Sequence, residues 1–493
     1  MGEDLTLFRA EFNGSVRIEA REDRLTSEAG AVILREVIER LGIVDYLVER
    51  IADPREPLLI THPWAELLNT SLVLLGQGWR DRDDADALRD DAALRLAVST
   101  RRGVSPLLSR PPREDGKPLS RNPEVPDGLP SQPTLSRLVR ALSTQEHRTV
   151  LRKALLETAA RRIRSGRRGG HRLRYLTLDI DSLPIEVHGH QPGSAHNGHY
   201  HARVYHPLIA SVAETGDLLD AKLREGSVHT AEGGIEFIGP LLQDVERKLC
   251  QVASVRMDAG FPEDKLCCFL EERGTPYVAR VRNNAVLDRM AEPFLKRPVG
   301  RPPTEPRTWL HEMSYRAEPW SRERRVVLVV LERWEELFLH HFWLITNWTA
   351  EAMSGEDLLA MYRERGTAEG HMGELMDVLD PALSSSPRPK SHYRGKVPEK
   401  RFPSGDSFAH NEVLLLLNVL AYDIVHTARV LIENATQQGW SLRRLRERVL
   451  RVAGRILVHG RRAVLVVGRS SAALWHAIWS RLTRLHLAQF AES

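Results

Sequence analysis

The sequence predicts an α/β protein in which a mixed β-sheet core lies between helical N-terminal and C-terminal regions. Three observations predict this class. Residues 29–98 carry apolar residues at helical spacing, residues 175–282 alternate strand-like runs with helical patterns, and helical spacing returns after residue 411. The chain has 493 residues, too many for one small core, so two to four domains are expected.

The composition is that of a globular protein rich in arginine. Hydrophobic residues make up 42% of the chain and charged residues 28%, the net charge is +4, and most of the 70 basic residues are arginines. Arginine suits phosphate recognition because its planar guanidinium binds oxyanions bidentately. A GC-rich genome would produce the same excess, so the arginine content alone does not decide the function.

The cysteines and the apolar runs indicate a reducing compartment and no membrane. Cys250, Cys267 and Cys268 form neither a disulfide framework nor a spaced zinc site. The N-terminus lacks the apolar core of a signal peptide. The longest apolar run, 413–421, is interrupted by Asn418 and predicts a buried core helix rather than a membrane span. We therefore expect a soluble, cytoplasmic protein.

The N-terminal region, residues 1–145, is predicted to be helical. The runs "AVILREVIERLGIVDYLVERI" and "PWAELLNTSLVLLGQGW" have helical spacing, whereas residues 101–133 are rich in Arg, Pro, Ser and Gly, as in a linker or an arm. Ser131 is a candidate N-cap for the helix in "SQPTLSRLVRALS". Residues 146–173, which end in "RRIRSGRRGGHRLR", are predicted to be a basic linker.

Residues 174–284 are predicted to form the first part of the sheet core. "YLTLDIDS" alternates strictly, and the strand candidates "ARVYHPLIASVA" and "DLLDAKLRE" follow it. A helix at 230–248, the strand "VASVRMD", the helix "EDKLCCFLEERG" and the strand "PYVARVR" complete the segment. The order β-β-β-α-β-α-β is that of the ribonuclease-H-like (retroviral-integrase-like) core, in which a three-strand meander precedes α/β units.

Three further segments complete the predicted organisation. Residues 285–349 open with "KRPVGRPPTEPR" and continue with the strand-like runs "RRVVLVVLER" and "HFWLITNW", which predict a β-rich insertion. Its five tryptophans either form the core of a small β-domain, or one of them stacks on a flipped base. Residues 350–436 hold the second part of the core. Residues 437–493 are predicted to be a basic helical region that contacts DNA or a second subunit.

The stretch "MYRERGTAEGHMGELMDVLD" reads as an unusual helix. A capping box of Ser354 and Asp357 precedes it, yet it contains three glycines, each costing about 1 kcal/mol relative to alanine in a helix interior. One stripe of this helix is predicted to carry a phenol, a guanidinium, a carboxylate and a thioether: Tyr362, Arg365, Glu369 and Met376. We expect a bulky, charged partner against this face.

Three acidic residues are candidates for a metal site. Asp181 ends the first strand of the core, Asp258 ends the fourth, and Glu369 lies on the late helix. In this fold the two strands are adjacent, so the carboxylates would converge as hard ligands for Mg²⁺, and two such ions can drive phosphodiester chemistry. Each aspartate could instead be a turn or cap residue, and Arg365 with Glu369 a surface ion pair. Asp179 could replace Asp181 as the first ligand.

Six histidines lie between His188 and His206. His199 and His201 would share a strand face, as two metal ligands might, but no cysteine and no closed ligand spacing accompany them. We expect polar packing beside the active site, or contact with DNA phosphates, rather than a zinc site.

The chain resembles a bacterial insertion-sequence transposase of the DDE type, in the cut-and-paste group with the signature Tyr-x2-Arg-x3-Glu-x6-Lys. Tyr362, Arg365 and Glu369 match the signature, while Met376 occupies the position of its lysine. "DIDSLPIEVHGHQPGSAHNGHYHARVYHPL" and "VRMDAGF" resemble the segments that hold the family's two aspartates. The likeness extends to "GWRDRDDADALRDD", "LPSQPTLSRL" and "RFPSGDSFAHNEVLLLLNVLAYDIV", and so covers most of the chain.

The resemblance implies a catalytic and metal-binding triad of Asp181, Asp258 and Glu369. It further implies two Mg²⁺ ions, for which Mn²⁺ would substitute, cleavage of double-stranded DNA at terminal inverted repeats, and transfer of the 3′ ends to target DNA by a homodimer that pairs two ends. Nucleoid-associated action in the bacterial cytoplasm would follow. The alternatives are a nuclease on the same fold without strand transfer and an inactive, repurposed DNA-binding protein. The expected DNA-contacting residues are Tyr362, Arg365, Arg301, Arg167, Arg168, Arg443 and Arg444.

Overall fold

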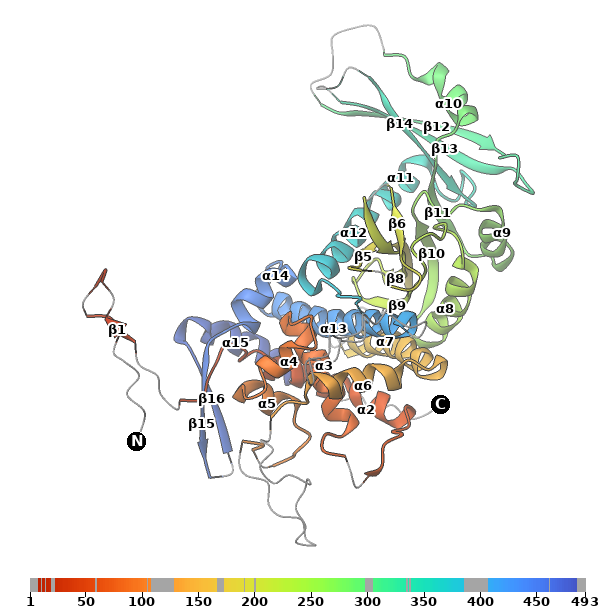
Figure 1. Cartoon of the computed structure of the whole chain (residues 1–493). Helices are drawn as coiled ribbons and strands as arrows, with labels where there is room; N and C mark the ends of the chain where they lie inside the picture. The colour runs from red at the N-terminus through yellow and green to blue at the C-terminus, as the bar shows by residue number, and fades with distance from the viewer. Residues whose placement is uncertain are drawn as a thin grey trace. The chain divides into compact units, whose positions relative to one another are not determined.

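The computed structural model divides into two compact units (Figure 1). The sheet unit comprises Glu49–Ile51, Val139–His426 and Ala488–Ser493, and the helical unit comprises Met1–Val48, Ala52–Leu138 and Thr427–Leu487. The structure describes residues 8–9, 11–13, 15–18, 23–57, 60–103, 105–107, 128–165, 173–189, 191–198, 201–297, 305–333, 336, 338–384, 407–460 and 462–485.

The sheet unit is built on one eight-stranded sheet of order β12-β13-β14-β11-β10-β4-β8-β9. The strands β4, β8 and β9 form an antiparallel meander, β10 pairs with β4 in parallel, and β11 pairs with β10 in parallel. This confirms the predicted ribonuclease-H-like order. The bounds are β4 Tyr175–Ser182, β8 Leu208–Val212, β9 Leu218–Lys222, α8 Gly234–Lys248, β10 Gln251–Met257, α9 Asp264–Arg273 and β11 Tyr277–Val281.

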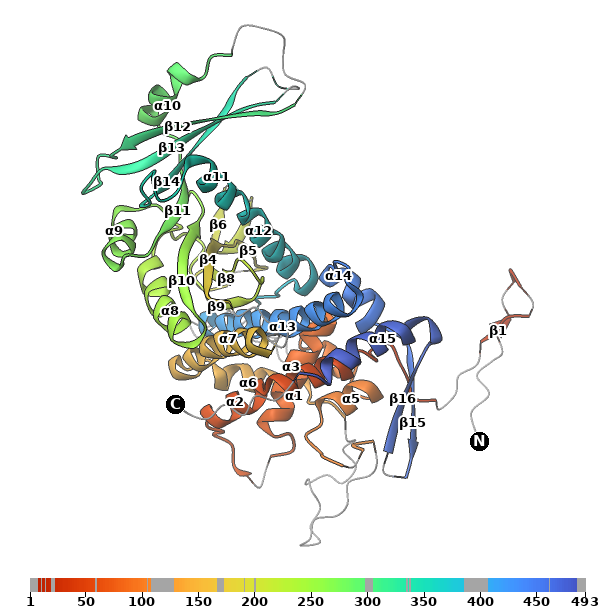
Figure 2. The same cartoon turned by 180° about the vertical axis from the view of Figure 1, so that it is seen from behind.

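The two faces of this sheet are covered by different helices. Leu178 and Ile180 of β4 are fully buried in one core with Phe237 of α8 and Leu266 of α9. On the opposite face, helix α11 (Gly355–Arg363) packs against strands β11, β13 and β14. Figures 1 and 2 show α8 and α9 on one side of the central strands and α11 on the other. The alternation in the sequence therefore sorts the side chains of β4 between two buried faces.

The β-rich insertion continues the core sheet. It contains α10 Ala285–Ala291, β12 Arg307–Tyr315, β13 Arg324–Glu332 and β14 His340–Thr346. Strand β14 pairs antiparallel with β11, so the three inserted strands extend the edge of the central sheet. Of the tryptophans in this segment, Trp320 and Trp343 are buried in the core that contains α8 and α9, and Trp309 is partly buried against it. Trp348 is partly buried against the core on the α11 face, and Trp334 lies outside the described residues.

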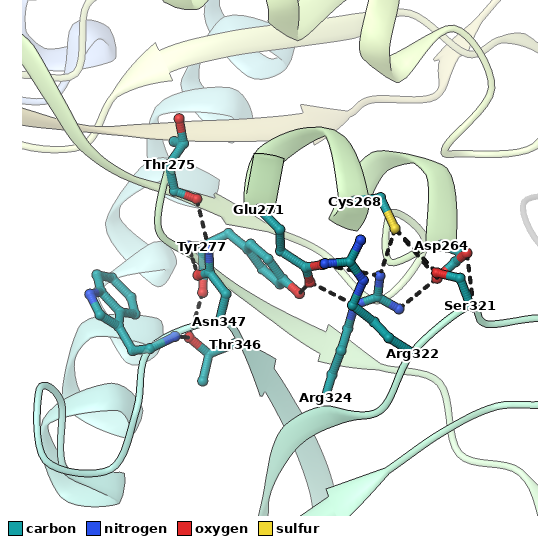
Figure 3. Close-up of polar contacts among 11 residues, drawn as sticks. Asp264, Cys268, Glu271, Thr275, Tyr277, Ser321, Arg322, Arg324, Thr346 and Asn347 are labelled. Carbon is teal, nitrogen blue, oxygen red and sulfur yellow. Dashed lines mark hydrogen bonds and ion pairs between the residues drawn. The ribbon is translucent and has the colours of Figure 1, made fainter. Parts of the chain in front are cut away.

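A buried arginine anchors β13 to α9 (Figure 3). Arg324 donates from Nη1 to Asp264 and from Nε to Glu271, both at 2.7 Å, and only 2% of its side chain is exposed. The Tyr277 hydroxyl donates to the same Glu271 carboxylate at 2.9 Å. Burial raises the pKa of the neighbouring Cys267 thiol to about 11, so this thiol stays protonated at neutral pH.

The run "ARVYHPLIASVA", predicted as one strand, is two strands in two sheets. Strand β7 (Ala202–Tyr205) pairs with β5 (Ile185–Glu186) and β6 (Ala195–Asn197), while β8 begins at Leu208 in the large sheet. The break falls at His206 and Pro207. Proline lacks the N–H that a central strand requires, which accounts for the separation.

Residues 146–173, predicted to be a linker, contain most of a long helix, α7 (Gln145–Ser165), which belongs to the sheet unit. Arg152 of this helix donates from Nε to Asp220 of β9 at 2.8 Å, and Arg162 pairs with the buried Asp217. These ion pairs hold Arg152 and Arg162 on the sheet, whereas the sequence pattern suggested a basic linker.

The helical unit confirms the predicted helical character of the N-terminal region. Its helices α1, α3 and α5 pack together, and each carries fully buried apolar residues: Ile33, Leu34, Leu68, Leu72 and Leu94. The bounds are α1 Ala31–Leu41, α2 Ile43–Arg50, α3 Trp64–Gln77, α4 Asp84–Ala87, α5 Ala92–Val98 and α6 Gln132–Leu142.

Helix α13 (Ser407–Thr436) contains the predicted core helix. Among the described residues it is the single helix long and apolar enough to cross a membrane, and 94% of its most apolar window is buried inside the protein. Val413, Leu415 and Ala421 are fully buried, which confirms the prediction of a core helix at 413–421.

The C-terminal region is only partly helical. The basic segment expected to be one helix is α-helical at α14 (Leu442–Leu445), continues as a π-helix over Arg446–Leu450, and then forms the hairpin β15 (Gly454–His459) and β16 (Arg462–Val467). Strand β15 also pairs with β3 (Leu25–Thr26), and α15 (Arg469–Leu482) follows. Ile456 packs on Ala92 and Ala93 with its strand neighbours exposed, an alternation typical of strands rather than helices.

Candidate functional site

Two of the predicted acidic residues, Asp181 and Asp258, lie side by side at the ends of adjacent strands in the centre of the sheet. Met257 pairs with Ile180 on the parallel strands β10 and β4, so Asp258 and Asp181 come next at neighbouring strand ends. The backbone N–H of Ser182 donates to Asp181 Oδ1 at 2.8 Å, which orients that carboxylate. The carbonyl of Asp258 accepts from the N–H of Phe261 at 3.2 Å and opens the turn into α9.

The third acidic residue lies on a helix that crosses this region. Ser354 caps α11 by accepting from the N–H of Asp357 at 3.1 Å, as predicted. The helix is interrupted at Glu364, resumes as α12 (Arg365–Glu374) with Glu369 in it, and becomes a π-helix over Leu375–Leu379. The prediction that Tyr362, Arg365, Glu369 and Met376 lie on one stripe of a continuous α-helix is therefore wrong. Met376 lies in the π-turn, whose wider spacing shifts it relative to Glu369.

Arg365 lies between two of the three carboxylates. Its Nη2 contacts Asp181 Oδ2 at 2.9 Å, its Nη1 pairs with Glu369 Oε1, and only 8% of its side chain is exposed. Burial lowers the pKa of this guanidinium, but the charges of Asp181 and Glu369 outweigh burial and raise it overall. Arg365 is thus a permanent cation held by the acidic side chains.

The electrostatics link all three carboxylates. Burial raises the pKa of Asp181, the charge of Arg365 opposes this, and the negative charges of Asp258 and Glu369 raise it further. The site therefore favours a positive charge among these side chains. Among the residues that the structure describes, no three acidic, histidine or cysteine side chains stand at metal-binding geometry, and it is Arg365 that occupies the place between Asp181 and Glu369.

Tyr362 borders the same cluster. Its ring packs at a tilt of 39° against Phe342, with centroids 6.4 Å apart. Burial raises the pKa of its phenol above the ordinary value, so the hydroxyl remains a neutral donor and acceptor at physiological pH. The charges of Arg365, Asp258 and Glu369 also act on this pKa, so the phenol lies within electrostatic reach of two of the three predicted ligands.

Asp179, the alternative first ligand, is engaged elsewhere. Its carboxylate is 2% exposed and accepts two hydrogen bonds from Arg256, from Nε at 2.6 Å and from Nη2 at 2.7 Å. Burial raises the pKa of Asp179, and the guanidinium opposes this shift. The carboxylate that faces Arg365 is that of Asp181. The geometry favours Asp181 as the ligand, and its role stays a prediction.

One histidine of the predicted polar cluster lies beside the site. His206 Nε2 and the Ser182 hydroxyl are 2.6 Å apart, next to Asp181 in the chain. Arg224 donates from Nε to the carbonyl of His206 at 2.8 Å and from Nη1 to three carbonyls of the loop 229–232. His199 lies outside the described residues. The contacts of His206 are those of polar packing.

The three glycines of α12 face open space. An added Cβ at Gly366, Gly370 or Gly373 would meet no atom within 4 Å. This leaves the backbone beside Glu369 accessible to a large partner. A different glycine is tightly enclosed: at Gly216, which has a φ of +73°, a Cβ would lie 2.6 Å from His371 Nε2 of α12. The turn between β8 and β9 thus supports the helix that carries Glu369.

The remaining predicted DNA-contacting residues lie apart from this cluster in the chain. Arg443 and Arg444 belong to α14 of the helical unit and are exposed, and the guanidinium of Arg444 stacks 4.2 Å from the Trp440 ring centroid. Arg167, Arg168 and Arg301 lie outside the described residues. Their roles stay predictions.

Arg256 is a residue of the site region that the sequence analysis did not identify. It lies in an apolar strand, two residues before Asp258, and pairs in register with Asp179, which itself lies two residues before Asp181. The signal was present in "LDID" and "VRMD", where a charged residue alternates with each aspartate on the same strand face. Such a charge inside a buried strand requires a partner.

The fold and this cluster define the class of protein. A ribonuclease-H-like sheet that carries two aspartates at adjacent strand ends, with a glutamate on a helix beside them, is typical of DDE-type proteins. Residues 8–380 match the family Transposase DDE domain group 1, and the chain belongs to that family. The matched range includes Asp181, Asp258 and Glu369.

Other comparisons give a distant likeness. No curated protein matches the sequence. Among solved structures the chain is similar to the piggyBac transposase synaptic complex with hairpin DNA, determined by cryo-EM, with a TM-score of 0.41 and 10% sequence identity. The likeness covers 94% of this chain and 87% of that chain.

Proposed function

We propose that the protein is a transposase that cleaves double-stranded DNA at the terminal inverted repeats of its insertion sequence and joins the 3′ ends to target DNA. The observation that carries this proposal is the contact of one buried guanidinium, that of Arg365, with both Asp181 and Glu369, beside Asp258. Asp181, Asp258 and Glu369 are the residues that the sequence resemblance implies as the catalytic triad, and all three lie within the range that matches the family.

The proposed ligands are of the chemical type that suits a divalent metal. Carboxylate oxygens are the ligands that Mg²⁺ and Mn²⁺ prefer, and the acidic cluster already holds a cation in the form of Arg365. Asp181, Asp258 and Glu369 would hold the metal, for which we propose two Mg²⁺ ions. When bound, such ions lower the pKa of a water or hydroxyl nucleophile and stabilise the leaving oxygen of a phosphodiester.

The side chains around the triad would bind and orient the DNA. Arg365 can bind a phosphate through two N–H donors, and the neutral phenol of Tyr362 offers a further hydrogen bond. The open glycine face of α12 would let a sugar-phosphate backbone approach the helix closely. These features together support a nucleic acid as the partner that the sequence led us to expect.

The helical unit would supply binding to the inverted repeats. Arg443 and Arg444 are exposed there and suit phosphate contacts. A homodimer would pair two element ends, acting on nucleoid DNA in the bacterial cytoplasm. The rival nuclease would cleave without joining, and an inactive DNA-binding protein would do neither.

The test is cleavage of DNA that contains the inverted repeats flanking the gene. With Mg²⁺ or Mn²⁺ the wild-type protein should nick at the repeat ends, while Glu369→Gln should bind the same DNA and leave it intact. Glu356→Gln, an exposed glutamate in the first turn of α11, is the matched control and should cleave normally. Cleavage by Glu369→Gln at the wild-type rate would refute the assignment of the triad.

A further inference from the structure

We infer that Arg256 is a positioning residue that ties the helix of Glu369 to the two strands that carry Asp181 and Asp258. This inference rests on the proposed function, since it concerns the geometry of the proposed triad. Among the contacts of the described residues, Arg256 forms no hydrogen bond or ion pair with Asp181, Asp258 or Glu369. It lies on β10, the strand that leads to Asp258, and it contacts Asp179 on β4 and the end of α11, from which the chain continues to Glu369.

The first two links lie within the sheet. Arg256 belongs to β10, and its side chain is 2% exposed. Its Nε and Nη2 donate to the two oxygens of Asp179 on β4 at 2.6 and 2.7 Å, the planar fork that fixes both distance and orientation. Because strand side chains alternate, Arg256 shares a sheet face with Asp258, and Asp179 shares that face with Asp181. The pair therefore fixes the two aspartate-bearing strand ends relative to each other.

The third link reaches the helix. The remaining terminal nitrogen, Nη1, donates to the carbonyl of Met361 at 2.7 Å and approaches Glu364 Oε2 at 3.4 Å. Met361 lies in the last turn of α11, where helix carbonyls lack partners within the helix. Glu364 is the residue at which α11 stops and α12 begins. Arg256 thus holds the junction between α11 and α12 at Glu364. Arg365 is the next residue of the chain, and Glu369 lies five residues after Glu364.

The energetics argue for a geometric role. Burying an ion pair is costly, and replacing such a pair with apolar side chains of similar volume is often neutral or stabilising. A pair placed two residues before each catalytic aspartate therefore contributes something other than stability. Arg256 and Asp179 also neutralise each other, so the pair can fix positions without adding net charge to the acidic cluster.

The experiment compares Arg256→Met and the double variant Asp179→Leu/Arg256→Met with the control Arg324→Met. Arg324 matches Arg256 in burial, at 2% side-chain exposure, and in its two carboxylate contacts, but it joins β13 to α9 (Figure 3). We measure thermal unfolding, hydrogen–deuterium exchange in peptides from residues 355–379 and from α8, and the rate and DNA half-saturation of end cleavage.

The double variant should regain most of the stability that Arg256→Met loses, because no charge is left buried and unpaired. Its α12 amides should nevertheless exchange at least tenfold faster than in the wild type, with α8 unchanged. Its cleavage rate at saturating DNA should fall at least tenfold, while half-saturation by DNA stays within twofold. Arg324→Met should lose stability without faster exchange in α12.

Two results would overturn the inference: a stable double variant with wild-type exchange in α12, or equal acceleration of α12 exchange in Arg324→Met. If Arg256→Met does not fold, the double variant alone decides. The exchange measurement needs neither metal nor DNA. Absence of cleavage in the wild type would therefore contradict the proposed function and leave the exchange result to decide the role of Arg256.

Discussion

Gly216 offers a precise way to disturb the helix that carries Glu369 without touching any acidic residue. It lies in the turn between β8 and β9 with a φ of +73°, and an alanine Cβ there would lie 2.6 Å from Nε2 and 2.9 Å from two carbons of the His371 ring. The His371 ring also packs edge-on against the ring of His426, with ring centroids 6.0 Å apart. His371 follows Glu369 by two residues on α12.

The expected magnitude has two parts. A side chain in the left-handed region costs about 1–2 kcal/mol whatever surrounds it, and forcing a methyl into a filled space adds about 1–3 kcal/mol. Gly216→Ala should therefore lower the free energy of unfolding by about 2–5 kcal/mol. Because misplacement of a reacting group by about 1 Å can reduce a rate by about 100-fold, we expect cleavage to fall tenfold or more.

Gly274→Ala is the matched control. Gly274 caps α9 with a φ of +72°, but an added Cβ there meets no atom within 4 Å. Gly274→Ala should therefore lower the free energy of unfolding only by the cost of a left-handed backbone, about 1–2 kcal/mol. This variant should cleave DNA at nearly the wild-type rate. The assay is chemical denaturation combined with end cleavage at saturating DNA. Equal losses of stability and of rate in the two variants would refute the proposed support of α12 by this turn.

Three other predictions concern single side chains. Asp179→Asn should cost about 3–5 kcal/mol of stability because it leaves Arg256 buried without its ionic partner. Asp181→Asn should instead fold normally and fail to cleave DNA. The reverse pattern in thermal melts and cleavage assays would contradict both assignments. Burial and the charge of Asp217 raise the pKa of Asp423 well above its ordinary value, so the folded protein holds a proton that the unfolded chain releases above about pH 4. Stability should then fall as pH rises toward the raised pKa, and Asp423→Asn should flatten this dependence in melts between pH 5 and 8; an unchanged slope would show that another group is responsible. Met376→Lys should change cleavage less than tenfold if another cation replaces the signature lysine, and a tenfold gain, about 1.4 kcal/mol of barrier, would show that the contact is missing.

Local periodicity was sufficient to predict the core. The alternation of "YLTLDIDS" predicted β4, and the order of strands and helices after it predicted which strand ends are neighbours, because this topology leaves few arrangements. That order placed Asp258 beside the strand end that carries Asp179 and Asp181, and the preference for Asp181 came from the family resemblance. The capping of α11 by Ser354 was also predictable, since its hydrogen bond spans three residues.

The features that sequence reasoning missed depend on distant partners. Nothing local indicates that β14 would pair with β11 and extend the core sheet, nor that residues 454–467 would form a hairpin against β3. At the interruption of the helix at Glu364, the carbonyl of Met361 accepts a hydrogen bond from Arg256, 105 residues away. In each case the missing information is a contact between segments far apart in the chain.

The measurement that tests the central claim most directly is strand transfer from pre-cleaved element ends to a target plasmid. With Mg²⁺, the wild-type protein should produce molecules in which the 3′ end of the element is joined covalently to the target. Asp258→Asn, which alters one proposed ligand and leaves the Arg365 contacts to Asp181 and Glu369 in place, should bind the ends and form no joined product. Joined product from Asp258→Asn, or nicked ends without joining from the wild-type protein, would contradict the proposal of a DDE transposase with this triad.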